Sequence, residues 1–414
     1  MTRPISRLSF RTLGLHKTFT SLSEGRFLRL WVGLQVMSLA SHMQMLTRTF
    51  LTYELTRSGV ILAFVSASWT IPMLILGLFG GAIADRVDRK ILIQAGQASI
   101  GIIAIFVGIL ITTKAVAWGH LIVAGFLQGC CWSTLNPARQ AIIPQLVPAD
   151  KLTNAMALTS AGMSLSMILA PAMGGLLYAA IGPDGVYYLV SAMLAIAVLF
   201  TATVKSETGR SQSENTSLIA DVRVGISYMA NRRVLLVILA VSMITLLLAS
   251  PFIYVLPVFV VEVYGRDSSG FGVLVSMLGI GALMASLVVA TLGSWKRGVF
   301  LIIGGFFSGT ALFLIGAVPL YWAATFFMFL LGVGSVSHIT LSQTLLMDNV
   351  EDEFRGRVAS VLSMSTIVVA FGLVPIGMAV DMLGGRTVAL ALGTMLLAIS
   401  FVVFISQKQL RRLD

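Results

Sequence analysis

The feature that most constrains this sequence is a succession of long apolar runs joined by short polar connections. A helix needs roughly 20 mostly apolar residues to cross a bilayer core about 30 Å thick. Runs of that order lie at about 30–52, 59–84, 91–113, 119–143, 154–180, 185–204, 234–261, 270–293, 299–318, 320–345, 358–381 and 387–405. Only 11% of the 414 residues are charged, against roughly 25% in soluble domains. We therefore expect an all-α membrane protein with twelve transmembrane helices.

The basic residues indicate how the chain is oriented. Twelve spans place both termini on one side, and lysine and arginine concentrate on cytoplasmic connections. Most basic residues lie on the tails and even-numbered connections, with Arg139 and Lys151 counted in the connection after the fourth run. The odd-numbered connections hold Arg57, Lys114, Arg266 and Arg386. We expect a multi-pass protein of the cytoplasmic (inner) membrane with both termini cytoplasmic.

The two halves of the chain resemble each other. YELTRSGVILAFVSA aligns Glu54 with Glu262 of VEVYGRDSSGFGVLVSM, and FLQGCCWSTLNPARQ pairs Gln140 with Gln343 of FLLGVGSVSHITLSQ. Two six-helix pseudo-repeats of this kind are typical of secondary transporters. The expected divisions are a cytoplasmic tail (1–29), a six-helix bundle (30–204), a cytoplasmic linker (205–233), a second six-helix bundle (234–405) and a cytoplasmic tail (406–414). The Arg-rich first tail is expected to lie on anionic lipid, with an organellar transit peptide as the alternative.

A charged motif, GGAIADRVDRK, fills the connection between the second and third runs. It resembles motif A of the major facilitator superfamily at Gly81, Asp85, Arg86, Arg89 and Lys90. Asp88 stands where that family usually has glycine. The resemblance implies a conformational latch, in which Asp85 contacts the start of the eleventh span near Val358 when the cavity faces outward. The alternative is that these charges only enforce orientation.

Further stretches resemble the same family. LAPAMGG is similar to the glycine-rich motif C of its exporters, with Pro171, Gly174 and Gly175 in place. Motif B is half present, because Gly125 stands where its arginine is expected. NPARQAIIPQLVPADKLTNAMAL and DEFRGRVAS resemble the branch that contains enterobactin exporters and macrolide-efflux proteins. The resemblance implies a major facilitator fold and export.

A polar stripe on the first run is the best candidate for a binding surface. At 100° per residue, one arc of this helix carries Ser38, Ser41, His42, Met45, Arg48, Thr49 and Thr52. Burying an arginine in lipid is costly, so Arg48 is expected to face water or a partner. It can bind an anionic group of a substrate, pair with Glu54, or extend toward the membrane surface.

Other polar and aromatic side chains complete the candidate list. The substrate-binding candidates are Arg48, Ser41, Met45, Trp69, Trp132, Asn136, Gln140, Tyr254 and Gln343. The proton-coupling candidates are His42, His338 and Glu54, since histidine titrates near neutral pH. Each of these can instead be a packing or interface residue. The adjacent Cys130 and Cys131 suit neither a disulfide framework nor a zinc site, so no metal or other cofactor is expected.

These features favour a secondary active exporter of a hydrophobic or amphiphilic small molecule, drug-like or siderophore-like. We expect it to be proton-coupled and monomeric, to work by alternating access, and to bind no nucleic acid. The sequence contains no GxxxxGKS/T nucleotide-binding motif. The alternatives are an importer or lipid transporter of the same fold, or a membrane receptor or enzyme scaffold. We expect no enzymatic activity, because no catalytic constellation has recognisable spacing.

Overall fold

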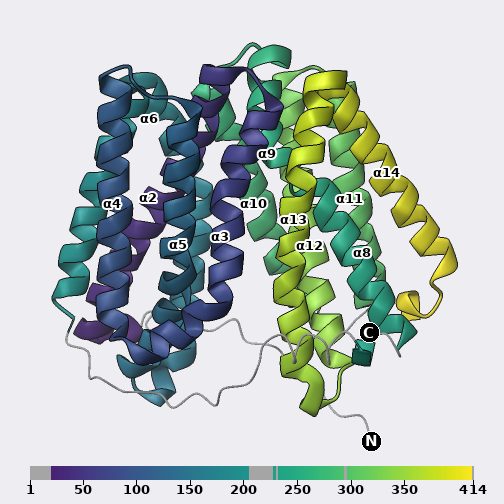
Figure 1. The fold of residues 1–414 in the computed structure, drawn as a ribbon. Coiled ribbons are helices and arrows are strands. Elements are labelled where there is room, and N and C mark those ends of the chain that lie inside the picture. Colours follow the sequence, from purple (N-terminus) through teal and green to yellow (C-terminus); the bar gives the residue numbers. More distant parts are fainter. Residues whose placement is uncertain (1–19, 205–226, 230–231, 293–295, 413–414) are drawn as a thin grey trace, which may run out of the picture.

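The computed structural model describes residues 20–204, 227–229, 232–292 and 296–412, and it contains helices and no strands within those ranges (Figure 1). Its side chains are described except at 78–86, 233, 292, 352, 359–360, 363–367 and 412. The α-helices are α2 (Gly25–Thr56), α3 (Gly59–Arg86), α4 (Arg89–Thr112), α5 (Trp118–Ile142), α6 (Leu152–Ala202), α8 (Arg233–Ala249), α9 (Phe252–Val258), α10 (Ser268–Leu292), α11 (Arg297–Ala317), α12 (Tyr321–Asp348), α13 (Arg355–Leu383) and α14 (Gly385–Ser406). Short helical turns are η1 (Thr20–Ser23), η2 (Ile143–Gln145), η3 (Ala149–Lys151), η4 (Phe259–Val263), η5 (Asp352–Phe354) and η6 (Leu410–Arg412).

The fifth, sixth and seventh runs have helix boundaries that differ from the sequence pattern. The 51-residue α6 covers both the fifth and the sixth run, and Gly182 divides it with a non-helical backbone (φ 76°, ψ 167°) that glycine adopts readily. The seventh run is broken at Ser250 and Pro251 into α8, α9 and the π-helical turn η4. Proline accounts for this break, because it lacks the N–H that a helix interior requires.

Eight stretches of the described chain are long and apolar enough to cross a bilayer. α6 counts as one of them, and α13 contributes only a shorter apolar segment, Val368–Leu383. α2 and α5 fall outside the eight, although each has the length to span. Both carry polar side chains of the predicted binding surface. The expectation of a helical membrane protein is therefore confirmed, and its least apolar long helices both carry candidate polar residues.

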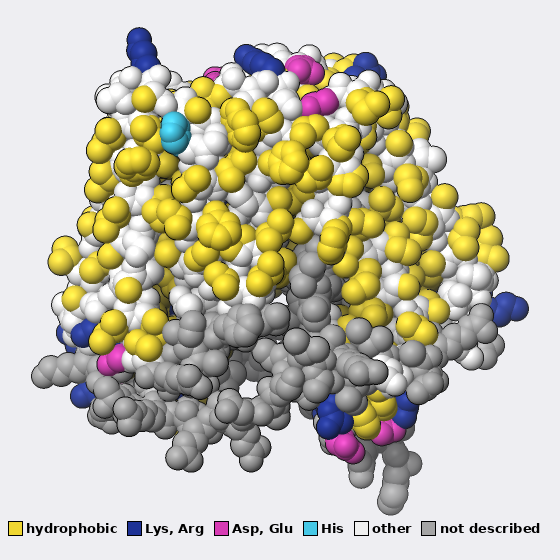
Figure 2. All heavy atoms as spheres, in the orientation of Figure 1, with side chains coloured by type: hydrophobic (Ala, Val, Ile, Leu, Met, Phe, Trp, Pro, Cys, Tyr) yellow, Lys and Arg dark blue, Asp and Glu magenta, His cyan; other side chains and the backbone are white. Residues whose placement is uncertain are grey.

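The outer surface fits a lipid environment. Figure 2 shows hydrophobic side chains over most of one flank, with charged side chains near its upper and lower edges. Large apolar side chains such as Phe106 on α4 and Phe371 on α13 are 59% and 73% exposed. Contiguous apolar surface of this kind is rare on soluble monomers and marks an interaction surface, here with a membrane.

The helices pack in two groups that meet along two helix pairs. In the first group α2 packs on α6, α3 on α5, and α4 on α5 and α6. In the second, α12 packs on α10 and α11, and α14 packs on α11. The groups lie on the left and right of Figure 1 and touch mainly through α3 with α13 and α6 with α10.

Glycines allow these two helix pairs to approach closely. A Cβ atom added at Gly175 on α6 would lie 2.3 Å from the carbonyl oxygen of Ser268, and one at Gly272 on α10 would lie 2.3 Å from that of Pro171. On the other pair, a Cβ at Gly377 would lie 2.5 Å from the carbonyl oxygen of Gly59. Small residues are what permit such backbone contact between membrane helices.

Polar contacts between the two groups close one end of the molecule. We call it the odd-loop end, because the odd-numbered connections lie there: α2 ends, α3 begins and α13 ends at the top of Figure 1. Asp381 on α13 accepts hydrogen bonds from the Ser58 hydroxyl (2.6 Å) and from the backbone N–H groups of Gly59 and Val60 (2.5 and 3.1 Å). We call these four residues the α3–α13 clasp. It places a carboxylate at the N-terminus of α3, where the helix dipole stabilises negative charge.

Other bonds between the groups continue from that end toward the middle of the helices. Tyr53 donates to Glu262 (2.5 Å) near the end of α2. On the α6–α10 pair, Ser268 donates to the carbonyl of Gly175 (3.0 Å), and Ser276 donates to the carbonyl of Ile168 (2.6 Å). The odd-loop end is therefore closed in this structure.

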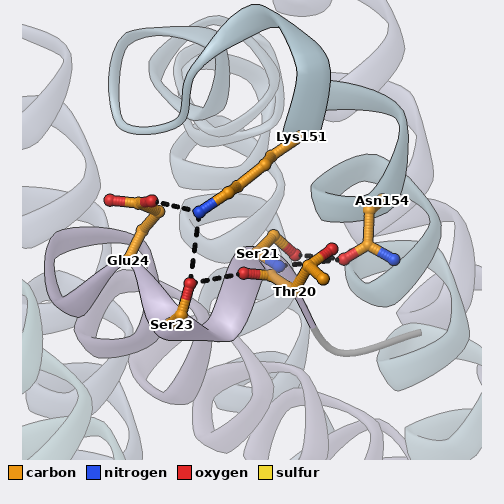
Figure 3. Close-up of polar contacts among 6 residues, drawn as sticks. All are labelled: Thr20, Ser21, Ser23, Glu24, Lys151 and Asn154. Carbon is orange, nitrogen blue, oxygen red and sulfur yellow. Dashed lines mark hydrogen bonds and ion pairs between the residues drawn. The ribbon is translucent and has the colours of Figure 1, made fainter. Parts of the chain in front are cut away.

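The chain is helical earlier than its apolar pattern predicts. α2 begins at Gly25 rather than near residue 30, and η1 lies against the start of α6 (Figure 3). The backbone N–H and hydroxyl of Ser21 donate to Asn154 Oδ1 (3.1 and 2.6 Å), and Lys151 forms an ion pair with Glu24 (2.6 Å). Part of the predicted lipid-bound tail is thus anchored to α6, and residues 1–19 of that tail lie outside the described residues.

Candidate functional site

Arg48 is the centre of the candidate site. It lies on α2, 80 residues from its partner Gln128 on α5, and its Nη1 donates to Gln128 Oε1 at 2.7 Å. Both side chains are buried, with Arg48 4% exposed and Gln128 5% exposed. The polar stripe of α2 therefore does place its arginine away from lipid, on an amide acceptor of the neighbouring helix.

A glycine on α5 leaves room for this guanidinium. A Cβ atom added at Gly125 would lie 3.2 Å from Arg48 Nη1 and 2.4 Å from the Ser68 hydroxyl of α3. Gly125 is one helical turn before Gln128, so both residues lie on the side of α5 that faces Arg48. The lack of a side chain at Gly125 thus makes room for the Arg48 guanidinium.

Two tyrosines from other helices lie around Arg48. Tyr187 on α6 and Tyr254 on α9 both lie within electrostatic range of Arg48. Tyr187 is 1% exposed, whereas Tyr254 is half-buried. Since α9 lies in the second half of the chain and packs against α2 and α3, the site draws on both halves.

Arg48 is not paired with Glu54. Glu54 is exposed and accepts a hydrogen bond from the hydroxyl of Tyr178. Within the described ranges no carboxylate lies within 4 Å of the Arg48 guanidinium, and Gln128 is its one hydrogen-bond acceptor. Of the alternatives that the sequence left open for Arg48, the pairing with Glu54 is therefore wrong in this structure.

A second buried arginine was missed by the sequence reasoning. Arg139 counted there as a loop charge, but α5 continues to Ile142, and Arg139 is 5% exposed within that helix. Its signal was present in NPARQ, where Asn136, Arg139 and Gln140 are spaced as neighbours on a helix. His42 lies within electrostatic range of Arg139.

The remaining candidates divide by their surroundings. Half-buried positions in the first group are held by Ser41, His42, Met45, Trp69, Trp132 and Asn136. The Ser41 hydroxyl is buried, and no partner for it occurs among the described residues. Gln140 and Gln343 are exposed. Cys130 and Cys131 are free thiols, both half-buried.

The two candidate histidines lie in different environments. His42 bonds the carbonyl of Ser38 in its own helix through Nδ1 (2.8 Å) and is half-buried. His338 is 2% exposed inside the second group, where its Nδ1 contacts the carbonyl of Leu301 on α11 (3.3 Å). His338 is therefore enclosed between helices of one group and does not join the Arg48 site.

Comparisons with known proteins agree with this architecture. The sequence profile of a family described as "Transmembrane secretion effector" matches residues 16–414, nearly the whole chain. The chain belongs to the major facilitator superfamily. The resemblance drawn from the motifs is confirmed, and the protein is a multi-pass membrane transporter of small molecules and not an enzyme.

Its relatives in the superfamily are transport proteins. Macrolide efflux protein A of Streptococcus pyogenes is 22% identical over 94% of this chain and 97% of the relative. The Staphyloferrin A transporter of Staphylococcus aureus is 24% identical over 86% of this chain and 89% of the relative. A crystal structure of the nucleoside transporter NupG superposes with a TM-score of 0.78 at 15% identity, covering 92% of this chain and all of that one. At that identity the superposition speaks only for a shared fold.

Motif A of this major facilitator protein is partly visible. The surroundings of Gly81 and the side chains of Asp85 and Arg86 lie outside what the structure describes. Arg89 donates to the carbonyl of Ala141 (3.0 Å), and Lys90 donates to that of Ala202 (2.8 Å). These contacts place two cations at the C-terminal ends of α5 and α6, where the helix dipole favours positive charge.

The departure from the usual motif A has a local explanation. Asp88, which replaces a glycine, caps α4 by accepting a hydrogen bond from the backbone N–H of Lys90 (2.8 Å). The capping carboxylate satisfies a donor that the first turn of a helix leaves free.

The motif C residues lie where the two groups meet. Gly175 and Pro171 contact Ser268 and Gly272 of α10, as the close backbone approach described above requires. Gly174 faces the other way, toward Met43 of α2. The motif is thus at the contact that closes the odd-loop end.

Proposed function

We propose that this protein is a secondary active exporter of a hydrophobic or amphiphilic small molecule that works by alternating access. The observation that carries the proposal is the buried Arg48–Gln128 site, which combines side chains from both halves of the chain below a closed odd-loop end. A binding site between two halves that separate alternately at either end is the general arrangement of such transporters.

In this proposal the chain crosses the membrane twelve times as two six-helix bundles, 30–204 and 234–405. Counting the two arms of α6 separately, and α8, α9 and η4 together, gives six helical spans on either side of residues 205–233. Both termini are then cytoplasmic, by the distribution of basic residues. We propose that the protein acts as a monomer, because the described residues around Arg48 all come from one chain.

The α3–α13 pair supplies the moving contact. Gly377 and Asp381 form a G-x-x-x-D sequence at the odd-loop end of α13, where Gly377 approaches Gly59 and Asp381 caps α3. Gly81 and Asp85 repeat the same spacing at the opposite end of α3. We infer that Asp85 forms the equivalent contact with the start of α13 when the odd-loop end opens, so that the two clasps alternate.

Protons supply the energy in this proposal. His42 is the preferred coupling group, because it is half-buried within the polar stripe of α2 and in electrostatic range of Arg139, whereas His338 is enclosed. Glu54 and Glu262 accept hydrogen bonds from tyrosines near the odd-loop end. This position suits a role in opening and closing that end better than a role in proton transfer. The export direction is supported by the motif C residues and by the efflux protein among the relatives.

The test is transport by purified protein in proteoliposomes. We expect an imposed pH gradient to drive accumulation of an amphiphilic fluorescent probe, and a protonophore to abolish it. His42→Gln should uncouple transport from the gradient, and His338→Gln is the matched control that should retain coupling. Gradient-driven movement only in the opposite direction would indicate an importer, and binding without any movement would contradict transport.

A further inference from the structure

The buried charges that the structure describes have one sign. Among the described side chains, Arg48 and Arg139 are buried, and no lysine, aspartate or glutamate is. Glu54, Glu262 and Asp381 lie near the odd-loop end, where the two glutamates accept bonds from tyrosines and Asp381 caps α3. The interior therefore carries positive charge without a negative counterpart from those residues.

Arg48 is equipped to hold an anion. A guanidinium has five N–H donors in a planar fork that matches a carboxylate. Within the described part of the chain only Gln128 Oε1, a neutral acceptor, takes one of them. A buried charge without a partner is strongly unfavourable, so a ligand that neutralises it gains the corresponding free energy. Tyr187 and Tyr254 lie within electrostatic range of the guanidinium.

Arg139 repeats this situation on α5, the helix that also carries Gln128. It is 5% exposed, and the described residues provide no hydrogen bond or ion pair to its guanidinium. Gln128 and Arg139 are eleven residues apart, which places them on nearly the same face of α5, roughly 16 Å apart along its axis. One face of α5 thus leads from Arg139, near the even-loop end of the helix, to the Arg48 site.

We propose that the transported molecule is an amphiphilic anion whose carboxylate or similar oxyanion binds Arg48, after first meeting Arg139. This inference rests on the export function proposed above and names the substrate class for that site. A cationic amphiphile is disfavoured by the same two charges, because specificity follows as much from like-charge repulsion as from attraction. Apolar parts of the molecule would contact the half-buried Met45, Trp69 and Trp132.

Three matched probes test the charge preference. They share a dansyl-aminoundecyl body and end in a carboxylate, a methyl ester or a trimethylammonium group. Binding to the full chain in nanodiscs of zwitterionic lipid is followed by dansyl fluorescence. We expect the carboxylate to bind about ten-fold more tightly than the ester, a difference of the size that one good ion pair provides, and the ammonium to bind most weakly. Equal binding of all three, or a preference for the ammonium, would overturn the proposal.

Variants assign the preference to Arg48. Arg48→Gln should bring carboxylate and ester to equal affinity, while Arg48→Lys should keep part of the difference. Gln128→Glu leaves the arginine in place but gives it an internal counter-ion, so it should also abolish carboxylate binding while the thermal unfolding temperature is maintained. Lys114→Gln, an exposed odd-loop cation, is the control and should bind as the natural protein does. Carboxylate preference that survives in Gln128→Glu would contradict the role of Arg48.

Two further arms of the test distinguish the anion site from lipid binding and from export itself. Adding phosphatidylglycerol to the nanodiscs should leave the carboxylate affinity within two-fold; displacement of the probe would assign the site to lipid headgroups and overturn the proposal. In proteoliposomes, export of the ammonium probe but not the carboxylate would refute the anion and leave export standing. Tight carboxylate binding without movement of any probe would refute export and leave the anion site standing.

Discussion

At the scale of single residues, the site depends on complementary choices at 48, 125 and 128. Arg48 needs an acceptor and space, and Gln128 and Gly125 on α5 provide them. The sequence pattern predicted Arg48 as a functional residue from its cost in lipid. It did not predict the partner, because the pairing of α2 with α5 depends on tertiary packing that a single-helix periodicity does not contain.

The glycine gives the first prediction. Gly125→Ala places a methyl group against Arg48 and Ser68, so we expect loss of most of the probe affinity and a destabilisation of about 1–3 kcal/mol from overpacking. Probe binding and thermal unfolding in detergent measure the two effects. Gly119→Ala on the same helix, where no atom lies within 4 Å of the added Cβ, is the control and should behave as the natural protein does. Full affinity in Gly125→Ala would show that Arg48 does not need this space.

At the scale of helices, the α3–α13 clasp holds the odd-loop end closed. Asp381→Asn keeps the size of the side chain but removes its charge from the N-terminus of α3, an effect of about 0.3–1 kcal/mol. We expect a shift of the conformational equilibrium toward states open at this end, measured by distance distributions between spin labels on α3 and α13. Asp184→Asn is the matched control, because Asp184 bonds Thr112 within the first group only. An unchanged distribution in Asp381→Asn would remove the clasp from the mechanism.

The α6–α10 pair gives a stronger perturbation. Gly272→Val would bring side-chain atoms against the backbone of Pro171 and Gly175, which cannot move aside without separating the helices. We expect this variant to insert normally, bind probe and lose transport, because the odd-loop end can no longer close. Gly77→Val, on α3 with no atom within 4 Å of its Cβ, should transport normally. Transport at the natural rate by Gly272→Val would show that this contact is dispensable.

Helix boundaries show where sequence reasoning stops. Hydropathy located the runs well, because lipid requires long apolar helices. It placed the start of α2 late, since the hydrogen bonds of Ser21 with Asn154 and the ion pair of Glu24 with Lys151 are tertiary contacts. It also placed Arg139 in a connection, because a charge near a helix end looks the same in sequence whether the last turn is buried or exposed.

At the scale of the whole molecule, the two contacts between the groups look like one contact repeated. The sequence alignment of the halves relates α3 to α10, and the order of the spans in each half then pairs the first arm of α6 with α13. The observed pairs are α3 with α13 and α6 with α10. Replacing each helix by its counterpart in the other half converts the first pair into the second. Glycine lies at both contacts, as Gly59 with Gly377 and Gly175 with Gly272. This correspondence supports the proposal of two six-helix repeats around a shared site.

The most direct test of alternating access is the accessibility of the site from each side of the membrane. A single cysteine is placed at Met45, with Cys130 and Cys131 replaced by alanine, and a membrane-impermeant maleimide is applied to right-side-out and inside-out vesicles. We predict labelling mainly from the cytoplasmic side in the natural background, and a shift to the outer side when Gly272→Val prevents closure. Simultaneous labelling from both sides, or the same preference in both backgrounds, would contradict alternating access.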